Sequence, residues 1–324
     1  MTEFRIYRNL EELPPDFWPS AITIGNFDGL HSGHRRIMRR VVEVARMNGW
    51  IPAALTFDPH PTRVVAPAKC PALLTTTEQR ARLMREEGIE AVVILPFTPE
   101  LSRFTPEQFI AEVVARRLRA RAILVGYNFR FGANHAGDID TLNALSGKYG
   151  YETEVVAGVQ RRGLTVSSTA IRQLIRAGNV LLAGRFLERV YGIEGEIVQG
   201  RGIGSKQTVP TLNLAATAEV LPANGVYVTR TYDLDSSRVW DSVTNIGLRP
   251  TFGGDSLSIE TFLLQPLTGD TPRRIRVEFL WRLRDERKFD SPEALKAQIL
   301  KDVGRAQAFL RRIRRWVRPN PLLD

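Results

Sequence analysis

The spacing of apolar residues divides the chain into two halves with different periods. In the first half, short apolar runs such as AITIGNF and PAALTFD alternate with segments whose apolar residues recur every three or four positions. The first such segment, 33–47, places Ile37, Val41 and Val44 on one face and ends at Asn48-Gly49, which predicts a helix. Buried strands that alternate with helices predict a parallel sheet covered by helices on both faces.

Two later segments carry clear helix signals. In TPEQFIAEVVARRLR, Thr105 stands at the N-cap position, Pro106 at the first helical position and Gln108 where a capping box needs it. The run DIDTLNALSGKYG predicts a helix that ends at Gly150.

After about residue 186 the period changes to that of strands. Six strand-like runs are separated by Gly, Pro, Asn and Asp turns, and no helical segment comes between them. They predict a six-stranded antiparallel barrel. A closing helix is predicted from Ser291-Pro292, and its apolar stripe is expected to face the core: Leu295, Ile299, Val303, Ala306, Leu310, Ile313 and Val317. The predicted domains are therefore 1–185 and 186–324.

Composition narrows the class of protein. The chain has 324 residues, of which 43% are hydrophobic, so two globular domains of adequate core size are expected. A single cysteine, Cys70, allows no internal disulfide and suits a reducing compartment. No apolar leader and no membrane-length apolar run is present, so a soluble cytoplasmic protein with no membrane partner is expected.

The formal net charge of +10 leaves three interpretations open. It fits a nucleic-acid partner, an anionic small molecule, or an arginine-rich composition without a special partner. The arginines are scattered, and the densest run is RRIRRWVR near the C-terminus. Phosphorylated small molecules would use the same positive field, so charge alone does not choose.

The stretch GNFDGLHSGH contains the first candidate chemistry. It follows a predicted strand of a parallel sheet, where ligands bind beyond the carboxyl ends. Its glycines let the backbone approach a ligand, and the next helix start favours phosphate. His31 and His34 can donate hydrogen bonds to phosphate oxygens, although a polar turn whose histidines cap the helix is the alternative. Zinc is not expected, because no Cys, Asp or Glu cluster lies nearby to complete a ligand set.

The motif H-x-G-H after a first strand resembles the nucleotidyltransferases that join a phosphate group to the α-phosphate of ATP. The longer form G-x-F-D-G-x-H-x-G-H resembles the prokaryotic bifunctional riboflavin kinase/FAD synthetase family. TFDPHP (56–61), VGYNFRFG (125–132), AGD (136–138) and SSTAIR (167–172) resemble further blocks of that family in the same order. Each block has a simpler structural interpretation, as a turn or a helix cap.

The resemblance implies a Rossmann-like nucleotidyltransferase domain that transfers AMP from ATP to FMN and releases pyrophosphate. His31, His34 and Arg172 would stabilise charge on the phosphates. Contacts to the flavin would come from Asp58, Pro59, His60, Pro61 and Asn128. Contacts to nucleotide or phosphate would come from Gly25, Asn26, Phe27, Asp28, Gly33, Asn128, Arg130, Ser167, Ser168 and Thr169.

The second half carries blocks that resemble the family's riboflavin kinase domain, a Greek-key barrel. GRGIGSK (200–206) lies between strands and lacks the Walker A spacing, so it is a candidate flap over ATP or a plain hairpin loop. P-T-x-N implies that Thr211 and Asn213 accompany Mg²⁺, which prefers oxygen donors. In IETF, Glu260 stands at the place of the catalytic glutamate, expected to act as general base on the ribityl hydroxyl. The flap residues expected to contact phosphate are Gly200, Gly202, Gly204 and Lys206.

The chain departs from the family pattern in two places. GSKQTVPT stands where the family commonly has G-R-x-L-G-F-P-T, and Phe262 and Gln265 stand where it often has His and Asp. A second hypothesis is therefore a monofunctional FAD synthetase with an impaired kinase domain. A third, from the basic charge, is a flavin- or RNA-binding regulator, although no nucleic-acid partner is expected because the aromatic and basic strand signature of RNA readers is missing. The oligomeric state is not assigned.

Overall fold

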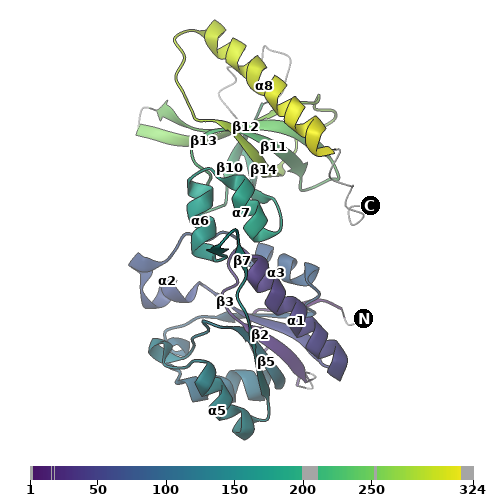
Figure 1. The fold of residues 1–324 in the computed structure, drawn as a ribbon, viewed down its shortest axis with the longest axis vertical. Coiled ribbons are helices and arrows are strands. Elements are labelled where there is room, and N and C mark those ends of the chain that lie inside the picture. The colour runs from purple at the N-terminus through teal and green to yellow at the C-terminus, as the bar shows by residue number, and fades with distance from the viewer. Residues whose placement is uncertain (1–2, 16, 18, 199–210, 252–253, 315–324) are drawn as a thin grey trace. The chain divides into compact units, whose positions relative to one another are not determined.

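The computed structural model describes residues 3–15, 17, 19–198, 211–251 and 254–314 (Figure 1). Contacts divide the chain into two compact units, Met1–Ala170 and Ile171–Asp324. The division falls inside helix α6 (Ser168–Arg176). The boundary at 185/186, which the change of period predicts, stays a prediction.

The first unit is built on a six-stranded sheet in which every pair of neighbours is parallel. The strand order is β1-β4-β3-β2-β5-β6, so chain order and sheet order differ and the connections cross over the sheet. A short hairpin, β7 (Gln160–Arg161) and β8 (Leu164–Thr165), follows it. The strands of the sheet are β1 (Arg5–Tyr7), β2 (Ser20–Ile24), β3 (Ile51–Asp58), β4 (Ala91–Pro96), β5 (Ala120–Gly126) and β6 (Glu152–Val156).

Helices cover both faces of this sheet, as the alternating pattern predicts (Figure 1). On one face lie α1 (Ser32–Asn48) and α3 (Thr77–Glu86), and on the other lie the π-helical segment η3 (Phe109–Arg117) and α5 (Ile139–Tyr149). Shorter helical segments complete the unit: α2 (Pro61–Val65), η1 (Pro67–Lys69), η2 (Leu101–Arg103), α4 (Pro106–Gln108) and η4 (Ala133–His135).

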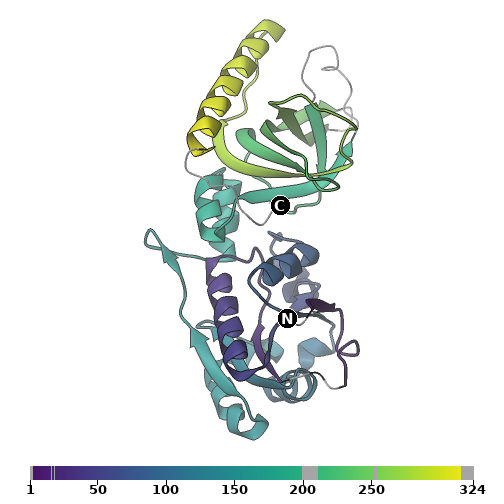
Figure 2. The same ribbon diagram turned by 90° about the vertical axis from the view of Figure 1, so that its right-hand side faces the viewer.

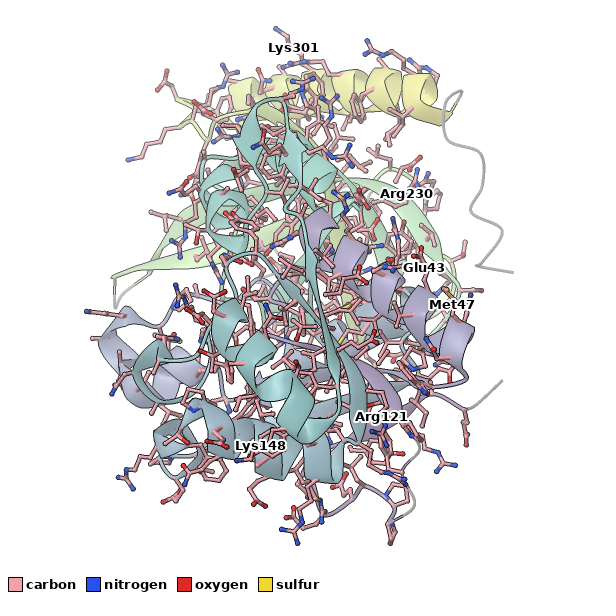
Figure 3. The ribbon with its side chains drawn as sticks, turned by 60° about the horizontal axis from the view of Figure 1, so that its bottom comes forward. Glu43, Met47, Arg121, Lys148, Arg230 and Lys301 are labelled. Carbon is pink, nitrogen blue, oxygen red and sulfur yellow. The ribbon has the colours of Figure 1, made fainter. Side chains whose placement is uncertain are left out.

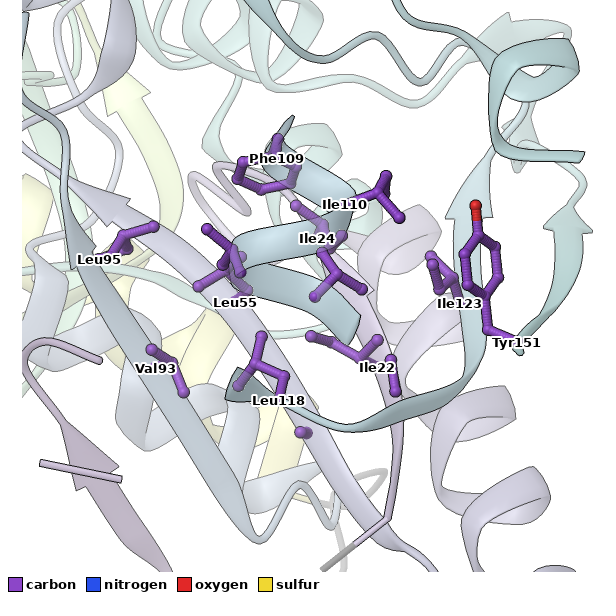
Figure 4. Packing of buried hydrophobic residues seen from close by; sticks show 14 of the residues in the cluster. Ile22, Ile24, Leu55, Val93, Leu95, Phe109, Ile110, Leu118, Ile123 and Tyr151 are labelled. Atoms are coloured by element: carbon purple, nitrogen blue, oxygen red, sulfur yellow. The ribbon is translucent and has the colours of Figure 1, made fainter. Parts of the chain in front are cut away.

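The larger apolar core of this unit lies between the sheet and η3 (Figure 4). Alternate residues of the strands point into it, among them Ile22 and Ile24 from β2 and Val93 and Leu95 from β4. The intervening residues point to the opposite core, under α1 and α3. A sheet buried on both faces explains why its strands read as continuous apolar runs rather than as alternating ones.

The predicted helix signals are present in the structure. Thr105 accepts a hydrogen bond from Gln108 N, and the Gln108 side chain accepts one from Thr105 N, which completes the capping box. Helices α1 and α5 end at Gly49 and Gly150, whose φ values of 68° and 70° lie in the left-handed region.

The second unit contains a closed barrel of six antiparallel strands, confirming the prediction (Figure 2). The order around the barrel is β10-β13-β12-β11-β14-β9, and β14 lies beside β11 after the meander β11-β12-β13, which is a Greek key. Two helices, α6 and α7 (Val180–Leu187), precede the barrel. Its strands are β9 (Tyr191–Val198), β10 (Thr211–Ala216), β11 (Gly225–Asp233), β12 (Val239–Thr251), β13 (Gly254–Leu263) and β14 (Arg274–Arg284).

Basic side chains are spread over many elements, as the sequence indicates. Figure 3 labels four of them, Arg121 on β5, Lys148 on α5, Arg230 on β11 and Lys301 on α8 (Pro292–Arg314). Among the described residues, no helix combines the length and the apolar character that crossing a membrane requires.

The prediction for the closing helix is wrong in its first half. Ala306 and Leu310 of α8 are buried against Val226, Val228, Val243 and Leu283 of the barrel. Leu295 and Ile299, by contrast, are 42% and 40% exposed. The helical period gives the direction of a stripe but not the extent of the partner surface, and the apolar cluster of the barrel packs only against the later turns. Val317 lies outside the described residues.

The difference in burial between Leu310 and Leu295 of α8 should appear as a difference in stability when each is substituted. We expect Leu310→Ala to lower the free energy of unfolding of the second unit by about 2–5 kcal/mol, because it empties a packed site. Leu295→Ala, the matched control in the same helix, should change it by less than about 0.5 kcal/mol. Urea denaturation followed by circular dichroism compares the two variants, and equal losses would contradict the assignment of Leu295 to the surface.

Candidate active sites

The first candidate site lies at the carboxyl ends of three neighbouring strands. In the order β3-β2-β5, β2 is paired in parallel with β3 through Ile24 and Leu55 and with β5 through Ile22 and Ile123. The blocks GNFDGLHSGH, TFDPHP and GYNFRFG follow or end these strands. Because parallel strands end at the same edge, three motifs that are far apart in the sequence begin side by side.

The turn after β2 has an unusual backbone. Phe27, Gly29 and Leu30 have φ values of 48°, 78° and 34°, and two of these three residues are not glycine. A side chain at Gly29 would place its Cβ 2.7 Å from Leu74 Cδ1, so the turn is tight as well as left-handed. The backbone N–H of Phe27 donates to no residue within the described ranges. Backbone strain of this kind persists where the surroundings hold it, often at ligand sites.

Asp28 anchors the turn rather than pointing into open space. Its carboxylate accepts hydrogen bonds from Leu74 N at 2.9 Å and from Thr75 N at 3.1 Å. Its carbonyl accepts one from Ser168 Oγ at 2.8 Å, which draws the start of α6 to the same turn. Asp28 is 3% exposed, and a direct contact with a nucleotide stays a prediction.

The two histidines form one unit at the start of α1. His31 is the N-cap residue and accepts a hydrogen bond from His34 N at 3.4 Å, as the capping interpretation requires. The two rings are stacked with centroids 3.6 Å apart, and Phe27 meets His34 edge-on. Gly33 allows this packing, because a Cβ there would lie 3.1 Å from the His31 ring. The pair therefore caps the helix, and its contact with phosphate stays a prediction.

The charge state of His34 follows from this packing. Burial lowers the pKa of His34 well below its usual value, and the neighbouring His31 lowers it further. In the protein alone His34 is therefore neutral at pH 7. The Nδ1 atom of His34 is buried without a hydrogen-bond partner among the described residues. Buried polar atoms normally have such a partner, so this ring nitrogen is able to form a hydrogen bond with a ligand.

The other predicted residues of this unit lie on the neighbouring strand ends. Asp58 ends β3, and His60 caps α2 by accepting from Thr62 N. Arg130 forms an ion pair with Asp138 at 2.8 Å, which joins the GYNFRFG and AGD blocks. Asn128 lies in the turn after β5 and is exposed. Pro59 and Pro61 keep this segment out of a strand, and a flavin contact there stays a prediction.

Helix α6 carries the last block of the first site. Ser167 caps it by accepting from Ala170 N, and Ser168 contacts Asp28 as described. Arg172 is one helical turn after Ser168 and is 7% exposed. Thr169 is exposed. Sequence reasoning grouped these residues on one helix start. The structure shows Ser168 in contact with the turn after β2, whereas Arg172 lies beyond the division between the two units, and its contact with phosphate stays a prediction.

The second candidate site is a row of polar side chains on one face of the barrel. Glu260 on β13 is directly opposite Asn213 on β10 and opposite Asn245 on β12. Residues paired in this way point to the same face with their Cβ atoms about 5 Å apart. Ser258 Oγ donates to Glu260 Oε1 at 3.0 Å. Thr211 lies two residues before Asn213, hence on the same face.

Sequence reasoning missed Asn245 and Glu286 of this site. A Cβ at Gly247 would lie 2.1 Å from Glu286 Oε1 and 3.2 Å from Asn245 Nδ2, so Gly247 makes room for both side chains. Asn245 lies in the run VTNIGLRPTF (243–252), and the register of β12 with β13 is the signal that would have identified it. The flap residues Gly200, Gly202, Gly204 and Lys206 lie outside the described residues.

Together, the two units define a class of protein: a nucleotidyltransferase-like α/β domain followed by a closed six-stranded antiparallel barrel. Comparison with known protein families supports the same two-domain class. Residues 14–170 match the family model described as FAD synthetase, and residues 187–310 match that of riboflavin kinase.

Other proteins are similar to this chain over nearly its whole length. The Escherichia coli K12 bifunctional riboflavin kinase/FMN adenylyltransferase is 32% identical over 95% of this chain and 98% of the relative. The Pseudomonas fluorescens protein of that name is 35% identical over 94% and 97%. The chain therefore belongs to the bifunctional riboflavin kinase/FMN adenylyltransferase family.

A solved structure extends the likeness to the fold. The crystal structure of a protein titled macrolide-efflux protein from Streptococcus pneumoniae has a TM-score of 0.82 and 25% sequence identity. It covers 94% of this chain and 98% of its own.

The charge state of His34 gives a testable pH dependence. Because the pKa of His34 is lower in the folded protein than in the unfolded chain, the unfolded chain binds more protons below about pH 6.5. The free energy of unfolding therefore has its full His34 contribution above that pH and loses it as the pH falls further. An anion at the site should raise the pKa of His34. Proton NMR of the four histidines, titrated with and without a non-hydrolysable ATP analogue, measures the shift. An analogue that binds without raising the His34 pKa would place the triphosphate elsewhere.

Proposed function

We propose that the chain makes FMN from riboflavin in its barrel unit and FAD from FMN in its α/β unit, using one ATP for each step. The observation that supports this most directly is that each unit gathers its motif residues at one place. The strand ends β3-β2-β5 do so in the first unit, and the row Asn213, Glu260 and Asn245 does so in the second.

In the first unit, an FMN phosphate oxygen attacks the α-phosphorus of ATP. The bond from this phosphorus to the oxygen that bridges to the β-phosphate breaks, and pyrophosphate leaves. The phosphate is already ionised at neutral pH, so catalysis consists of positioning and charge stabilisation rather than base catalysis. The Phe27 N–H, His31 and His34 are donors suited to the phosphates, and the segment 58–61 with Asn128 would contact the flavin.

In the second unit, the acceptor is the ribityl hydroxyl of riboflavin, a weak nucleophile that needs a base. Glu260 would accept its proton as the γ-phosphoryl group of ATP is transferred. Ser258 holds one carboxylate oxygen at 3.0 Å, which limits the rotation of the side chain.

Mg²⁺ is the metal that this site fits. Thr211 and Asn213 offer hydroxyl and amide oxygens, the hard donors that Mg²⁺ prefers, and Glu260 lies beside them. The described residues contain no group of three His, Cys, Asp or Glu that could hold a metal alone, so ATP oxygens would complete the ligand set. Bound there, the ion would neutralise phosphate charge.

The remaining expectations about partners stay predictions. We propose that the protein acts in the cytoplasm on small molecules only and without a nucleic-acid partner. The hypothesis of an impaired kinase domain concerns GSKQTVPT, which lies almost wholly outside the described residues. Thr211, Asn213 and Glu260 are unchanged by that departure, which favours an active kinase.

Removing the base should separate the two activities. We expect Glu260→Gln to lower FMN formation by about 10²–10⁴-fold, because proton transfer loses its acceptor, and to leave FAD formation from supplied FMN unchanged. Product analysis by liquid chromatography, with riboflavin or FMN and Mg-ATP, measures both. Glu196→Gln, an exposed glutamate on β9, is the matched control and should retain both activities. Riboflavin phosphorylation near the normal rate in Glu260→Gln would refute the base assignment.

Removing the histidine pair should impair FAD formation and spare riboflavin phosphorylation, the reverse of the Glu260 variant. We expect the double variant His31→Ala, His34→Ala to lower FAD formation by at least about 10²-fold, through loss of two donors to the phosphates. Riboflavin phosphorylation in the same preparation should stay within about twofold of the normal rate, since those residues belong to the other unit. His135→Ala, an exposed histidine of η4, is the control. Undiminished FAD formation in the double variant would remove the histidines from the site.

A further inference from the structure

Arg80 is the largest fully buried side chain among the described residues of this protein. It lies in α3 and is 1% exposed. Its guanidinium donates to the carbonyl of Asn26 at 2.6 Å, to Thr56 Oγ1 at 3.3 Å and to Thr77 Oγ1 at 2.9 Å. All these acceptors are neutral. Within the described part of the chain, no carboxylate lies within ion-pair distance of Arg80, and its Nε has no partner.

A buried cation without a paired carboxylate is costly. Desolvation of such an ion typically costs several kcal/mol, and neutral acceptors offset only part of this. Burial lowers the pKa of Arg80, while the charges of Asp28, Asp58 and Glu78 oppose that change from a distance. One of these carboxylates, that of Asp28, accepts hydrogen bonds from the backbone of 74–75. The packing of α3 alone does not need a charge, since Met84 fills the next buried turn.

The hydrogen bonds of Arg80 indicate a role for its positive charge in the turn after β2. Its strongest hydrogen bond fixes the carbonyl of Asn26, which belongs to the turn between β2 and α1. Thr56 Oγ1 donates to the same carbonyl at 3.4 Å, so two donors hold this one oxygen. In a trans peptide the C=O and the following N–H point in opposite directions. The Phe27 N–H therefore points away from Arg80, and it is the donor without a described partner.

We propose that Arg80 is a positioning residue for adenylyl transfer, which fixes and polarises the Asn26–Phe27 peptide so that the Phe27 N–H faces a phosphate of ATP. This inference rests on the proposed FAD synthesis in the first unit. The charge-assisted hydrogen bond holds Phe27 at its φ of 48°, a conformation that a residue other than glycine rarely adopts. The positive charge behind the turn also favours the phosphates in a site of low dielectric constant.

The test compares two variants of the full-length chain. Arg80→Met keeps the size of the side chain and removes the charge, and we expect kcat for FAD formation to fall by about 10–100-fold. Arg80→Lys keeps the charge with fewer donors and should lose less, about fivefold. The KM for FMN should change little in either, because the positioned N–H acts on the phosphates of ATP. Riboflavin phosphorylation in the same samples should stay within about twofold.

Each outcome decides the proposal. A kcat for FAD formation within twofold of the wild type in Arg80→Met, or equal losses in Met and Lys, would overturn it. If thermal unfolding shows that Arg80→Met no longer folds its first unit, Arg80→Lys decides, and a folded Lys variant with a normal kcat overturns the proposal. Thr77→Val removes one anchor of the guanidinium and keeps the hydrogen bond to Asn26, so it should retain most of the activity. Wild-type protein that forms no FAD at all would instead contradict the proposed function.

Discussion

The parallel pairing of β2 with β3 and β5 is the constraint on which the first site depends. Main-chain hydrogen bonds fix which residues are neighbours, Ile24 with Leu55 and Ile22 with Ile123. Parallel strands need long crossover connections, so the motif blocks stand far apart in the sequence yet begin at one edge. Two side-chain contacts then hold the turn at this edge: its own Asp28 accepts from the backbone of 74–75, and Arg80 of α3 donates to its Asn26 carbonyl.

The barrel positions its polar residues through the two-residue alternation of its strands. Along β11, β12 and β13, alternate residues point inward. There a fully buried chain of hydroxyls, 2.7–3.0 Å apart, is formed by Thr229, Thr231, Ser242, Thr244 and Thr261. Every hydroxyl in this chain has a partner, which is what allows polar groups in the interior. The residues between them point outward, and Asn245 and Glu260 are among these. A register shift of one residue would exchange the two sets and destroy the polar row.

Much of this fold can be predicted from the sequence, because its signals are local. The capping box at Thr105, the glycine stops of two helices and the six strand runs each depend on residues within a few positions. The exposed first half of α8 could not be predicted, because a stripe on a helix does not give the extent of its partner. Arg80 could not either, since a charged residue on an amphipathic helix reads as solvent-facing. Its burial depends on a carbonyl group from the turn after β2 and on a hydroxyl group from β3.

The two sites also differ in which atoms carry the chemistry, and this affects how each tolerates sequence change. In the proposed mechanism the first site uses a backbone turn at positive φ, so its glycines, its buried anchors and the helix start would all have to be kept. In the same proposal the second site uses side chains in strand register, and main-chain pairing among the described strands sets the register of β10, β13 and β12. The departure GSKQTVPT therefore alters the segment before the row and leaves the row itself in place. For that reason the geometry of the barrel argues for a kinase that is retained rather than lost.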